Sequence, residues 1–348
     1  MKSTLTFDHC SVAVSQEQRE IFESDVQLIF AVLDDLRDER GIPGYRATVV
    51  LCDDLAAEVS QRDSRLAALQ AEAGSDVQQF TVERIGGVVT GKNLPLSEDC
   101  SEIALVFDSR FWQGPVDDTL ARARGIGVIA HELAHPLISR SLHRAGLLDM
   151  TWRVPYTREQ IVEFVSVTLF EEYQADVVSD VTLGAIAKVE TETGERGATI
   201  WDVYGQDMEA ALVEVLAETY PAWPNRVHRY RVGEEDLGAM FRNTNQDILG
   251  TLMCMIHAET ASRRSRDEDL LASRPLRDIA GARLYLEDEW PGFYQALRES
   301  PILPTPEEMP AAIRAAISAG DALMTSIWKQ LGLEAETVDD GSVYVYVD

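Results

Sequence analysis

The stretch VIAHELAHPL, residues 128–137, contains the pattern HExxH, and it is the starting point for predicting the fold and the chemistry of the chain. Three apolar residues precede His131, and Leu133 and Ala134 separate Glu132 from His135. This apolar setting favours an α-helix. Residues four apart share one face of a helix, so His131 and His135 would present two imidazoles to one point.

Two imidazoles at this spacing are a known arrangement for binding Zn²⁺. Glu132 follows the first histidine, and from the same turn it can reach a water molecule held by the ion. The ion makes that water more acidic, and the carboxylate can take its proton as the water attacks a carbonyl group. The pattern therefore predicts metal-assisted hydrolysis with Glu132 as general base. A helix with two surface or core histidines is the alternative.

The helix that carries the pattern should begin near residues 114–115, where a Gly-Pro pair is followed by acidic residues. Gly125 and Gly127 lie inside it and weaken it, which suggests close packing against a neighbouring element. Pro136 lacks an N–H group, so we expect a kink or the end of the helix there.

A catalytic zinc ion needs a third protein ligand and an open position. The extended pattern HExxHxxGxxH would require glycine and histidine where this chain has Ile138 and Ser141, which excludes that class. His143 is a weak candidate, because it lies beyond the Pro136 break.

A better candidate lies downstream in EEYQAD, residues 171–176. Glu172 and Asp176 are four apart and would share one helical face. Glu172 can bind the metal, while Asp176 can accept the outer N–H of a metal-binding histidine, which would set the tautomer of its ring. The alternative is a solvated acidic face in an acidic protein.

HELAH followed by a helix with E-x-x-A-D resembles the gluzincin group of zinc peptidases, and most closely its compact HtpX-like and ImmA/IrrE-like members. The resemblance covers residues 40–185. It implies that His131, His135 and Glu172 bind zinc, that Glu132 is the general base and that Asp176 is an outer partner of a ligand. In that group, the edge strand before the active helix pairs with the substrate backbone, which here would be residues 102–108.

Members of the group often use a distal Tyr or His to stabilise the oxyanion. His9 and His257 are expected to be structural instead. The candidates for the oxyanion role are Tyr156, Tyr173, Tyr204, His228 and Tyr230.

Outside the motif, local patterns predict an α+β fold. Ser15 and Gln18 form a capping box before a helix that ends near residue 40. Short apolar runs at 46–52 and 102–108 indicate strands, and residues 157–182 indicate a helix.

The expected fold is zincin-like: a small mixed sheet and an active-site helix bearing HExxH, followed by a mostly helical C-terminal part. Breaks in the later helices are expected near residues 221–224, and the last residues, 342–348, alternate like a strand. The expected domains are a metallopeptidase domain over residues 1–190 and a helical subdomain over residues 191–348.

The composition of the chain disfavours several classes of binding partner. The chain of 348 residues carries a net charge of −28, which disfavours binding to nucleic acid or to anionic lipid. The four cysteines form no CxxC pair, so a cysteine-based metal site is not expected. No stretch has the length and apolar character of a membrane helix, and the N-terminus does not resemble a signal peptide, so a cytoplasmic protein is expected.

These observations predict a zinc metallopeptidase that acts on peptides or proteins. Two other functions stay open: an interaction protein that keeps the metal site without catalysis, and a zinc hydrolase of small amides. The sequence predicts neither the cleavage preference nor the oligomeric state.

Overall fold

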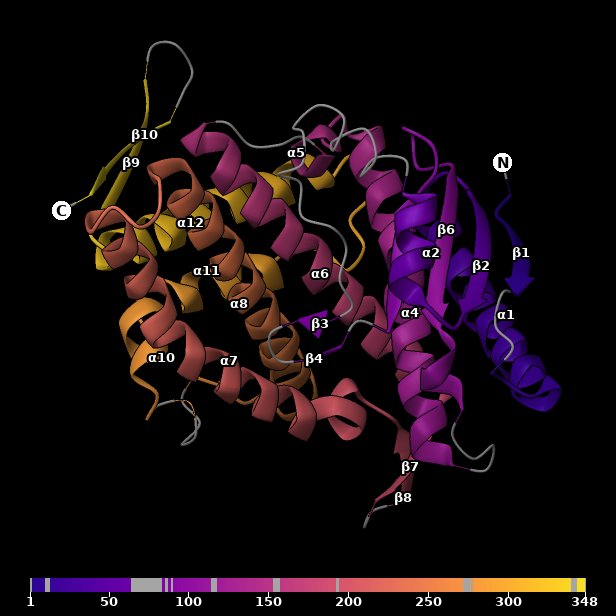
Figure 1. Cartoon of the computed structure of the whole chain (residues 1–348). Helices are drawn as coiled ribbons and strands as arrows, with labels where there is room; N and C mark the ends of the chain where they lie inside the picture. Colours follow the sequence, from indigo (N-terminus) through magenta and orange to yellow (C-terminus); the bar gives the residue numbers. More distant parts are fainter. Residues whose placement is uncertain are drawn as a thin grey trace. The chain divides into compact units, whose positions relative to one another are not determined.

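The computed structural model describes residues 2–9, 13–63, 83–84, 87–88, 90–113, 118–152, 157–191, 194–271, 276, 278–338 and 343–347. Helices and strands are mixed, which confirms the α+β prediction (Figure 1). The strands are β1 (Thr4–His9), β2 (Arg46–Cys52), β3 (Glu83–Arg84), β4 (Gly87–Val88), β5 (Gly91–Pro95), β6 (Glu102–Asp108), β7 (Lys188–Thr191), β8 (Gly194–Gly197), β9 (Leu333–Thr337) and β10 (Val343–Val347). The helices are α1 (Gln16–Glu39), α2 (Leu55–Arg62), the 3-10 helix η2 (Ser109–Trp112), α4 (Thr119–Arg144), α5 (Asp149–Trp152), α6 (Arg158–Ile186), α7 (Ile200–Arg231), α8 (Leu237–Arg266), α10 (Ala280–Tyr285), α11 (Trp290–Arg298) and α12 (Met309–Gln330).

The chain forms two compact units. Unit 1 comprises residues 1–145 and 174–204, and unit 2 comprises residues 146–173 and 205–348. The limit between them falls inside the continuous helix α6, so α6 contributes to both. The domain limit expected at residues 190 and 191 is not a limit of these units, and the division of the chain into functional domains stays a prediction.

The sheet of unit 1 has four strands in the order β1-β2-β6-β5. The first three are parallel, with Thr4 beside Arg46 and Arg46 beside Glu102, whereas β5 is antiparallel to β6. Strands β2 and β6 have the predicted limits, because both are apolar runs buried on both faces. Strands β1 and β5 were not predicted, because β1 is partly exposed and β5 contains Gly, Asn and Pro, which are rare in strands.

The prediction that residues 102–108 form an edge strand is wrong. Strand β6 lies between β2 and β5, so both of its edges are already paired. Within the described residues, β5 is the last strand on this side of the sheet. The prediction failed because no local pattern indicated a strand at β5.

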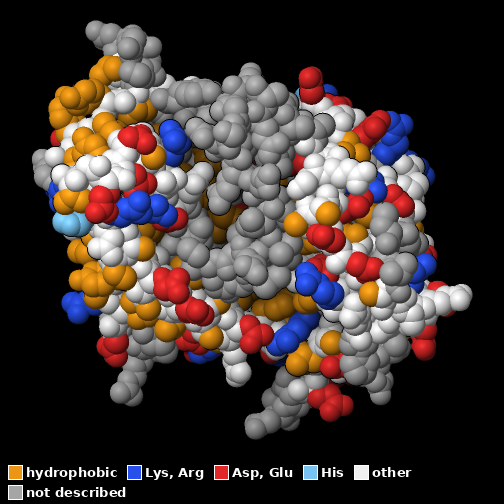
Figure 2. Space-filling view, viewed as in Figure 1, with side chains coloured by type: hydrophobic (Ala, Val, Ile, Leu, Met, Phe, Trp, Pro, Cys, Tyr) orange, Lys and Arg blue, Asp and Glu red, His pale blue; other side chains and the backbone are white. Residues whose placement is uncertain are grey.

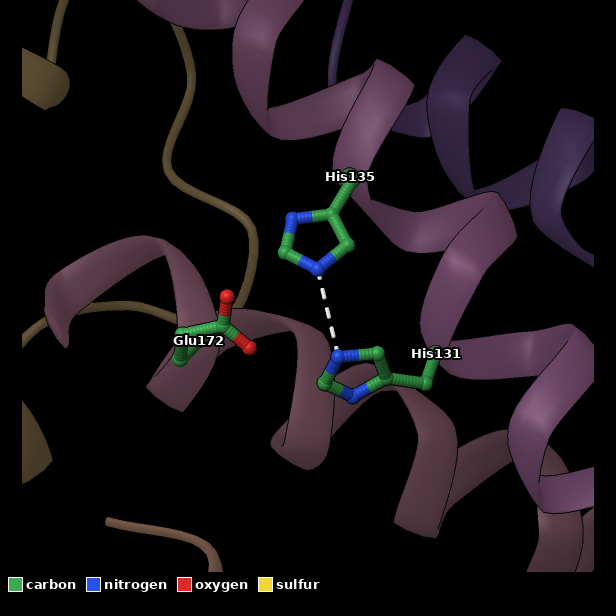
Figure 3. A group of neighbouring side chains, drawn as sticks. All are labelled: His131, His135 and Glu172. Carbon is green, nitrogen blue, oxygen red and sulfur yellow. Dashed lines mark hydrogen bonds between the residues drawn. The ribbon is translucent and has the colours of Figure 1, made fainter. Parts of the chain in front are cut away.

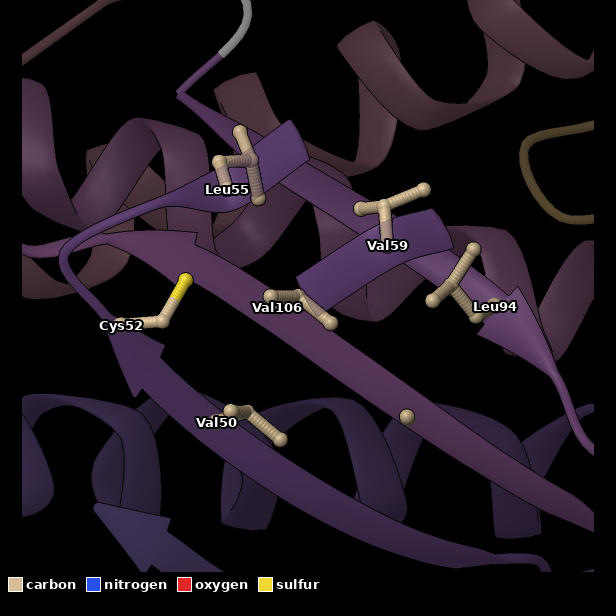
Figure 4. Close-up of a cluster of buried hydrophobic side chains, with 7 residues drawn as sticks. Val50, Cys52, Leu55, Val59, Leu94 and Val106 are labelled. Carbon is tan, nitrogen blue, oxygen red and sulfur yellow. The ribbon is translucent and has the colours of Figure 1, made fainter. Parts of the chain in front are cut away.

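Helices cover both faces of the sheet in unit 1. On one face, α2 places Leu55 and Val59 over a cluster of buried strand residues that includes Val106 (Figure 4). Neighbouring residues of a strand point to opposite faces, so Phe107 faces away from α2. There it meets Phe22 of α1, with 5.7 Å between ring centroids. Helix α4 contacts α1, β5 and β6, and this packing places the HExxH pattern beside the edge strand.

Two helix boundaries differ from the sequence predictions. Helix α4 continues through Pro136 to Arg144, so of the two outcomes predicted there, a kink or the end of the helix, the end is wrong. Helix α7 likewise continues through Pro221 and Pro224, where a break was expected. In α7, Trp223 is buried and packs on Tyr285 at 4.9 Å between ring centroids. Packing of this kind overrides the local preference of proline.

Unit 2 is mostly helical in its described residues, as predicted for the C-terminal part. Helix α12 packs against α10, α11 and strand β9. Trp328 of α12 is buried, and its indole N–H donates to Oδ1 of Asn245 on α8 at 2.9 Å. The C-terminal strand β10 pairs with β9 in an antiparallel hairpin, which supplies the partner that its sequence requires.

The visible surface carries charged side chains of both signs (Figure 2). Figure 2 shows Asp and Glu side chains at many separate places on the visible face, with Lys and Arg side chains among them. None of the helices in the described ranges combines the length and the apolar character that a membrane crossing requires.

Candidate metal centre

Helix α4 carries the HExxH pattern, as predicted. Its predicted start at residues 114–115 lies outside the described residues. The described helix begins after Asp118, whose carboxylate accepts hydrogen bonds from the N–H groups of Leu120 and Ala121 at 3.0 Å. These bonds satisfy donors that the first turn of a helix leaves open.

Small residues let α4 approach its neighbours closely. A side chain at Gly125 would overlap the ring of Trp112, and a Cβ at Gly127 would lie 3.0 Å from the ring of Tyr204. The carbonyl of Gly127 also accepts a hydrogen bond from Ser179 of α6 at 2.8 Å. The close packing predicted from these two glycines is confirmed against Trp112 and Tyr204, and the Ser179 hydrogen bond joins α4 to the C-terminal half of α6.

The two histidines of the pattern direct their outer nitrogens toward each other. Nε2 of His131 lies 3.2 Å from Nε2 of His135, and both side chains are half-buried (Figure 3). Two nitrogens bound tetrahedrally at zinc distances of about 2.0–2.1 Å would be roughly 3.4 Å apart. The spacing therefore fits two ligands of one ion.

Glu172 of α6 completes a group of three possible ligands. One carboxylate oxygen of Glu172 and one nitrogen of each histidine all lie within 4.8 Å of one another (Figure 3). All three side chains are partly exposed, so an ion could enter from solvent. His131, His135 and Glu172 could therefore hold a metal ion.

Asp176 contacts the inner side of His131. Its Oδ1 lies 3.0 Å from Nδ1 of His131, and its side chain is 5% exposed. A carboxylate at this position accepts the Nδ1–H of a neutral imidazole, which leaves the Nε2 lone pair for a metal. The contact is the one that an outer partner of a metal ligand would make.

Glu132 is half-buried and lies next to the edge strand. A Cβ at Gly91, the first residue of β5, would be 2.9 Å from Cγ of Glu132 and 3.1 Å from the ring of Phe107. Any larger residue at this position would require the Glu132 or Phe107 side chain to shift. The Glu132 side chain therefore lies beside the first residue of β5, the last strand of the sheet within the described residues.

The other residues predicted as a ligand or as an oxyanion donor lie outside the ligand group. His143 is exposed in the last turn of α4 and does not belong to the ligand group. The hydroxyl of Tyr204 donates to the carbonyl of Arg124, and burial raises the pKa of Tyr204 well above its usual range. His228 is exposed on α7, and Tyr156 lies outside the described residues.

His257 was expected to be structural, yet the structure places it beside a candidate metal ligand. Its Nε2 on α8 lies 3.8 Å from Oε2 of Glu172. No sequence signal pointed to this residue, because a single histidine in a long helix has no spacing to interpret. Its proximity to Glu172 is set by the fold of unit 2, to which both residues belong.

No protein-family model matches the chain, and neither the curated proteins nor the solved structures contain a significant match to it. The geometry of the metal centre therefore stands as the basis for assigning a function.

Proposed function

We propose that this protein is a zinc-dependent hydrolase with a zincin-like active site, and that it cleaves peptide bonds. The observation that carries the proposal is the convergence of His131, His135 and Glu172, together with the contact of Asp176 with His131. Four residues from two helices take up relative positions that a metal ion and its outer partner would require.

The donor set supports zinc. Two imidazole nitrogens and one carboxylate oxygen are the ligands of several catalytic zinc sites, which leave a fourth position open. A structural zinc site normally has four protein ligands, frequently cysteines. Among the described residues the group has three possible ligands, which favours catalysis over a purely structural role.

Each residue of the site has a definite task in this proposal. His131, His135 and Glu172 would hold the ion, and Asp176 would keep the His131 ring in the tautomer that binds it. Bound zinc supplies a Lewis acid and lowers the pKa of water toward about 7. Glu132 would take the proton at its carboxylate and later return it to the leaving amine.

The position of β5 supports a peptide substrate. An unpaired strand edge can add an extended peptide through main-chain hydrogen bonds. In the described residues, β5 offers such an edge, and its first residue, Gly91, lies against Glu132. A peptide paired with β5 would run past the general base.

Two other functions remain as alternatives. An interaction protein could keep the metal ligands without catalysis, but such a protein would have no use for Glu132 as a base. A hydrolase of small amides would share the metal centre and Glu132 but would not need the edge of β5. Cleavage of long peptides in preference to small amides would distinguish a peptidase from such a hydrolase.

The test is peptide cleavage by the zinc-loaded protein with a mixed peptide library as substrate. We expect about one zinc ion per chain, and we expect a chelator to abolish cleavage. Glu132→Gln should retain zinc and reduce cleavage by about 10²- to 10⁴-fold, since the amide cannot accept a proton.

Glu171→Gln is the matched control, because it removes a neighbouring carboxylate from α6 and should leave cleavage unchanged. Undiminished turnover by Glu132→Gln would remove this residue from the mechanism. A zinc content below about 0.2 equivalents after supplementation would contradict the metal site itself.

A further inference from the structure

We infer that His257 of α8 is a positioning residue for Glu172, holding its carboxylate in the orientation that binds the metal. The inference rests on the proposed role of Glu172 as a ligand. It assigns part of the metal centre to α8, a helix outside the part of the chain that resembles the gluzincins.

The contact lies within unit 2. Nε2 of His257 is 3.8 Å from Oε2 of Glu172, and the two side chains are 27% and 16% exposed. Partial shielding from water strengthens the attraction between a ring N–H and a carboxylate. His257 is not a member of the ligand group itself, so its contact points to Glu172 rather than to the ion.

A chain of buried contacts links α6 to α8 near this pair. Tyr173, the residue after Glu172, packs edge-on against Tyr294 of α11 with 5.7 Å between ring centroids. The hydroxyl of Tyr294 donates to Oγ1 of Thr260, one turn along α8 from His257, at 3.3 Å. Tyr173, Tyr294 and Thr260 are all buried, so this link between α6 and α8 is made by side chains shielded from water.

A carboxylate can serve two partners at once. Its two oxygens offer about four lone-pair sites, so Glu172 can bind an ion and also accept a hydrogen bond. At 3.8 Å the present separation is longer than a hydrogen bond, and a small rotation of either side chain would shorten it. Once shortened to a hydrogen bond, this contact would limit rotation of the carboxylate, which would lower the entropic cost of binding the ion.

Glu172 and His131 would then be supported in the same way. Asp176 contacts His131, a ligand from α4, and His257 contacts Glu172, a ligand from α6. Such outer partners typically contribute a factor of about 10 to 100 in metal affinity. The contact of His257 is longer and more exposed than that of Asp176, so we expect its effect at the lower end of that range.

The experiment measures zinc affinity of the full chain by competition with a chromophoric chelator. His257→Ala should weaken zinc binding by about tenfold. His257→Gln keeps an N–H donor on a side chain of similar reach and should recover most of the loss. His228→Ala, which removes an exposed histidine of α7, should bind zinc like the unmodified protein.

Thermal unfolding of the metal-free proteins separates this role from a structural one. We expect the three variants to melt like the unmodified metal-free chain, so that a change in affinity cannot be attributed to folding. Equal losses of affinity in His257→Ala and His257→Gln, or no loss in His257→Ala, would overturn the inference. An unmodified chain that binds no zinc would instead refute the proposed function.

Discussion

Helices α4 and α6 each contribute two residues, four positions apart, to the candidate metal centre, but the two pairs make different contacts. In α4, the Nε2 atoms of His131 and His135 lie 3.2 Å apart, so both side chains could bind the same metal ion. In α6, Glu172 joins the same ligand group, whereas Asp176 contacts the inner nitrogen of His131. Spacing along a helix determines which residues share a face, but the neighbouring helix determines what each of them contacts.

The strongest test of this difference separates Glu172 from Glu171. One residue along a helix is a rotation of about 100°, so the two carboxylates cannot face the same point. Glu172→Ala should weaken zinc binding by more than about 100-fold, the upper limit for outer partners, because it removes a ligand. Glu171→Ala should change zinc binding little. Zinc titration against a competing chelator would measure both.

A larger loss in Glu171→Ala than in Glu172→Ala would show that the ligand assignment on α6 is wrong. His143→Ala provides a second check, since His143 is exposed and outside the ligand group. A loss in His143→Ala equal to that in His131→Ala would contradict the ligand assignment on α4.

An intermediate effect is expected at Asp176. Asp176→Ala should reduce zinc affinity by about 10- to 100-fold, because His131 loses the acceptor that sets its tautomer. Asp176→Asn should lose less, since the amide oxygen can still accept the Nδ1–H. Chelator competition at constant pH would rank these two variants.

Asp180 is the matched control for Asp176, one turn further along α6. Its carboxylate accepts a hydrogen bond from the N–H of Ile200 at 3.1 Å, at the start of α7. Asp180→Ala should therefore lower the free energy of unfolding by about 1–2 kcal/mol and leave zinc affinity unchanged. A loss of zinc affinity in this variant would mean that Asp176 acts through general stability of α6.

The smallest effect is expected at Gly91, where β5 approaches Glu132 of α4, the proposed general base. Gly91→Ala would bring a methyl group to 2.9 Å from Cγ of Glu132, and overpacking of this kind typically costs about 1–3 kcal/mol. We expect a loss at the lower end, because the Glu132 side chain can move. Zinc content should be retained while cleavage falls.

Gly250 of α8 serves as the control for Gly91, because a Cβ there would meet nothing within 4 Å. Gly250→Ala should raise the free energy of unfolding by up to about 1 kcal/mol through helix propensity. Urea unfolding measures both variants. Unchanged stability and cleavage in Gly91→Ala would show that Glu132 does not depend on the close approach of β5.

Elements that carry a strong local pattern were predicted well. The capping box at Ser15 and Gln18 is present, with hydrogen bonds of 2.9 and 3.2 Å, and α1 follows it. The two buried strands at 46–52 and 102–108 have the predicted limits, because continuous apolar runs of this length are typical of strands buried on both faces. Strand β5 lacks such a run, and the edge of the sheet was therefore misplaced.

The residues of the candidate metal centre were predicted from the sequence, and the structure brings His131, His135 and Glu172 together. The spacing of His131, Glu132 and His135 on one helix, and of Glu172 and Asp176 on another, follows from the helical period of 3.6 residues. Helical spacing does not predict contacts between different elements. The contact of Gly91 with Glu132 and that of His257 with Glu172 appear only in the tertiary structure. The period of a helix is a property of neighbouring residues, whereas contacts between residues about 40 or 85 positions apart depend on how whole elements pack.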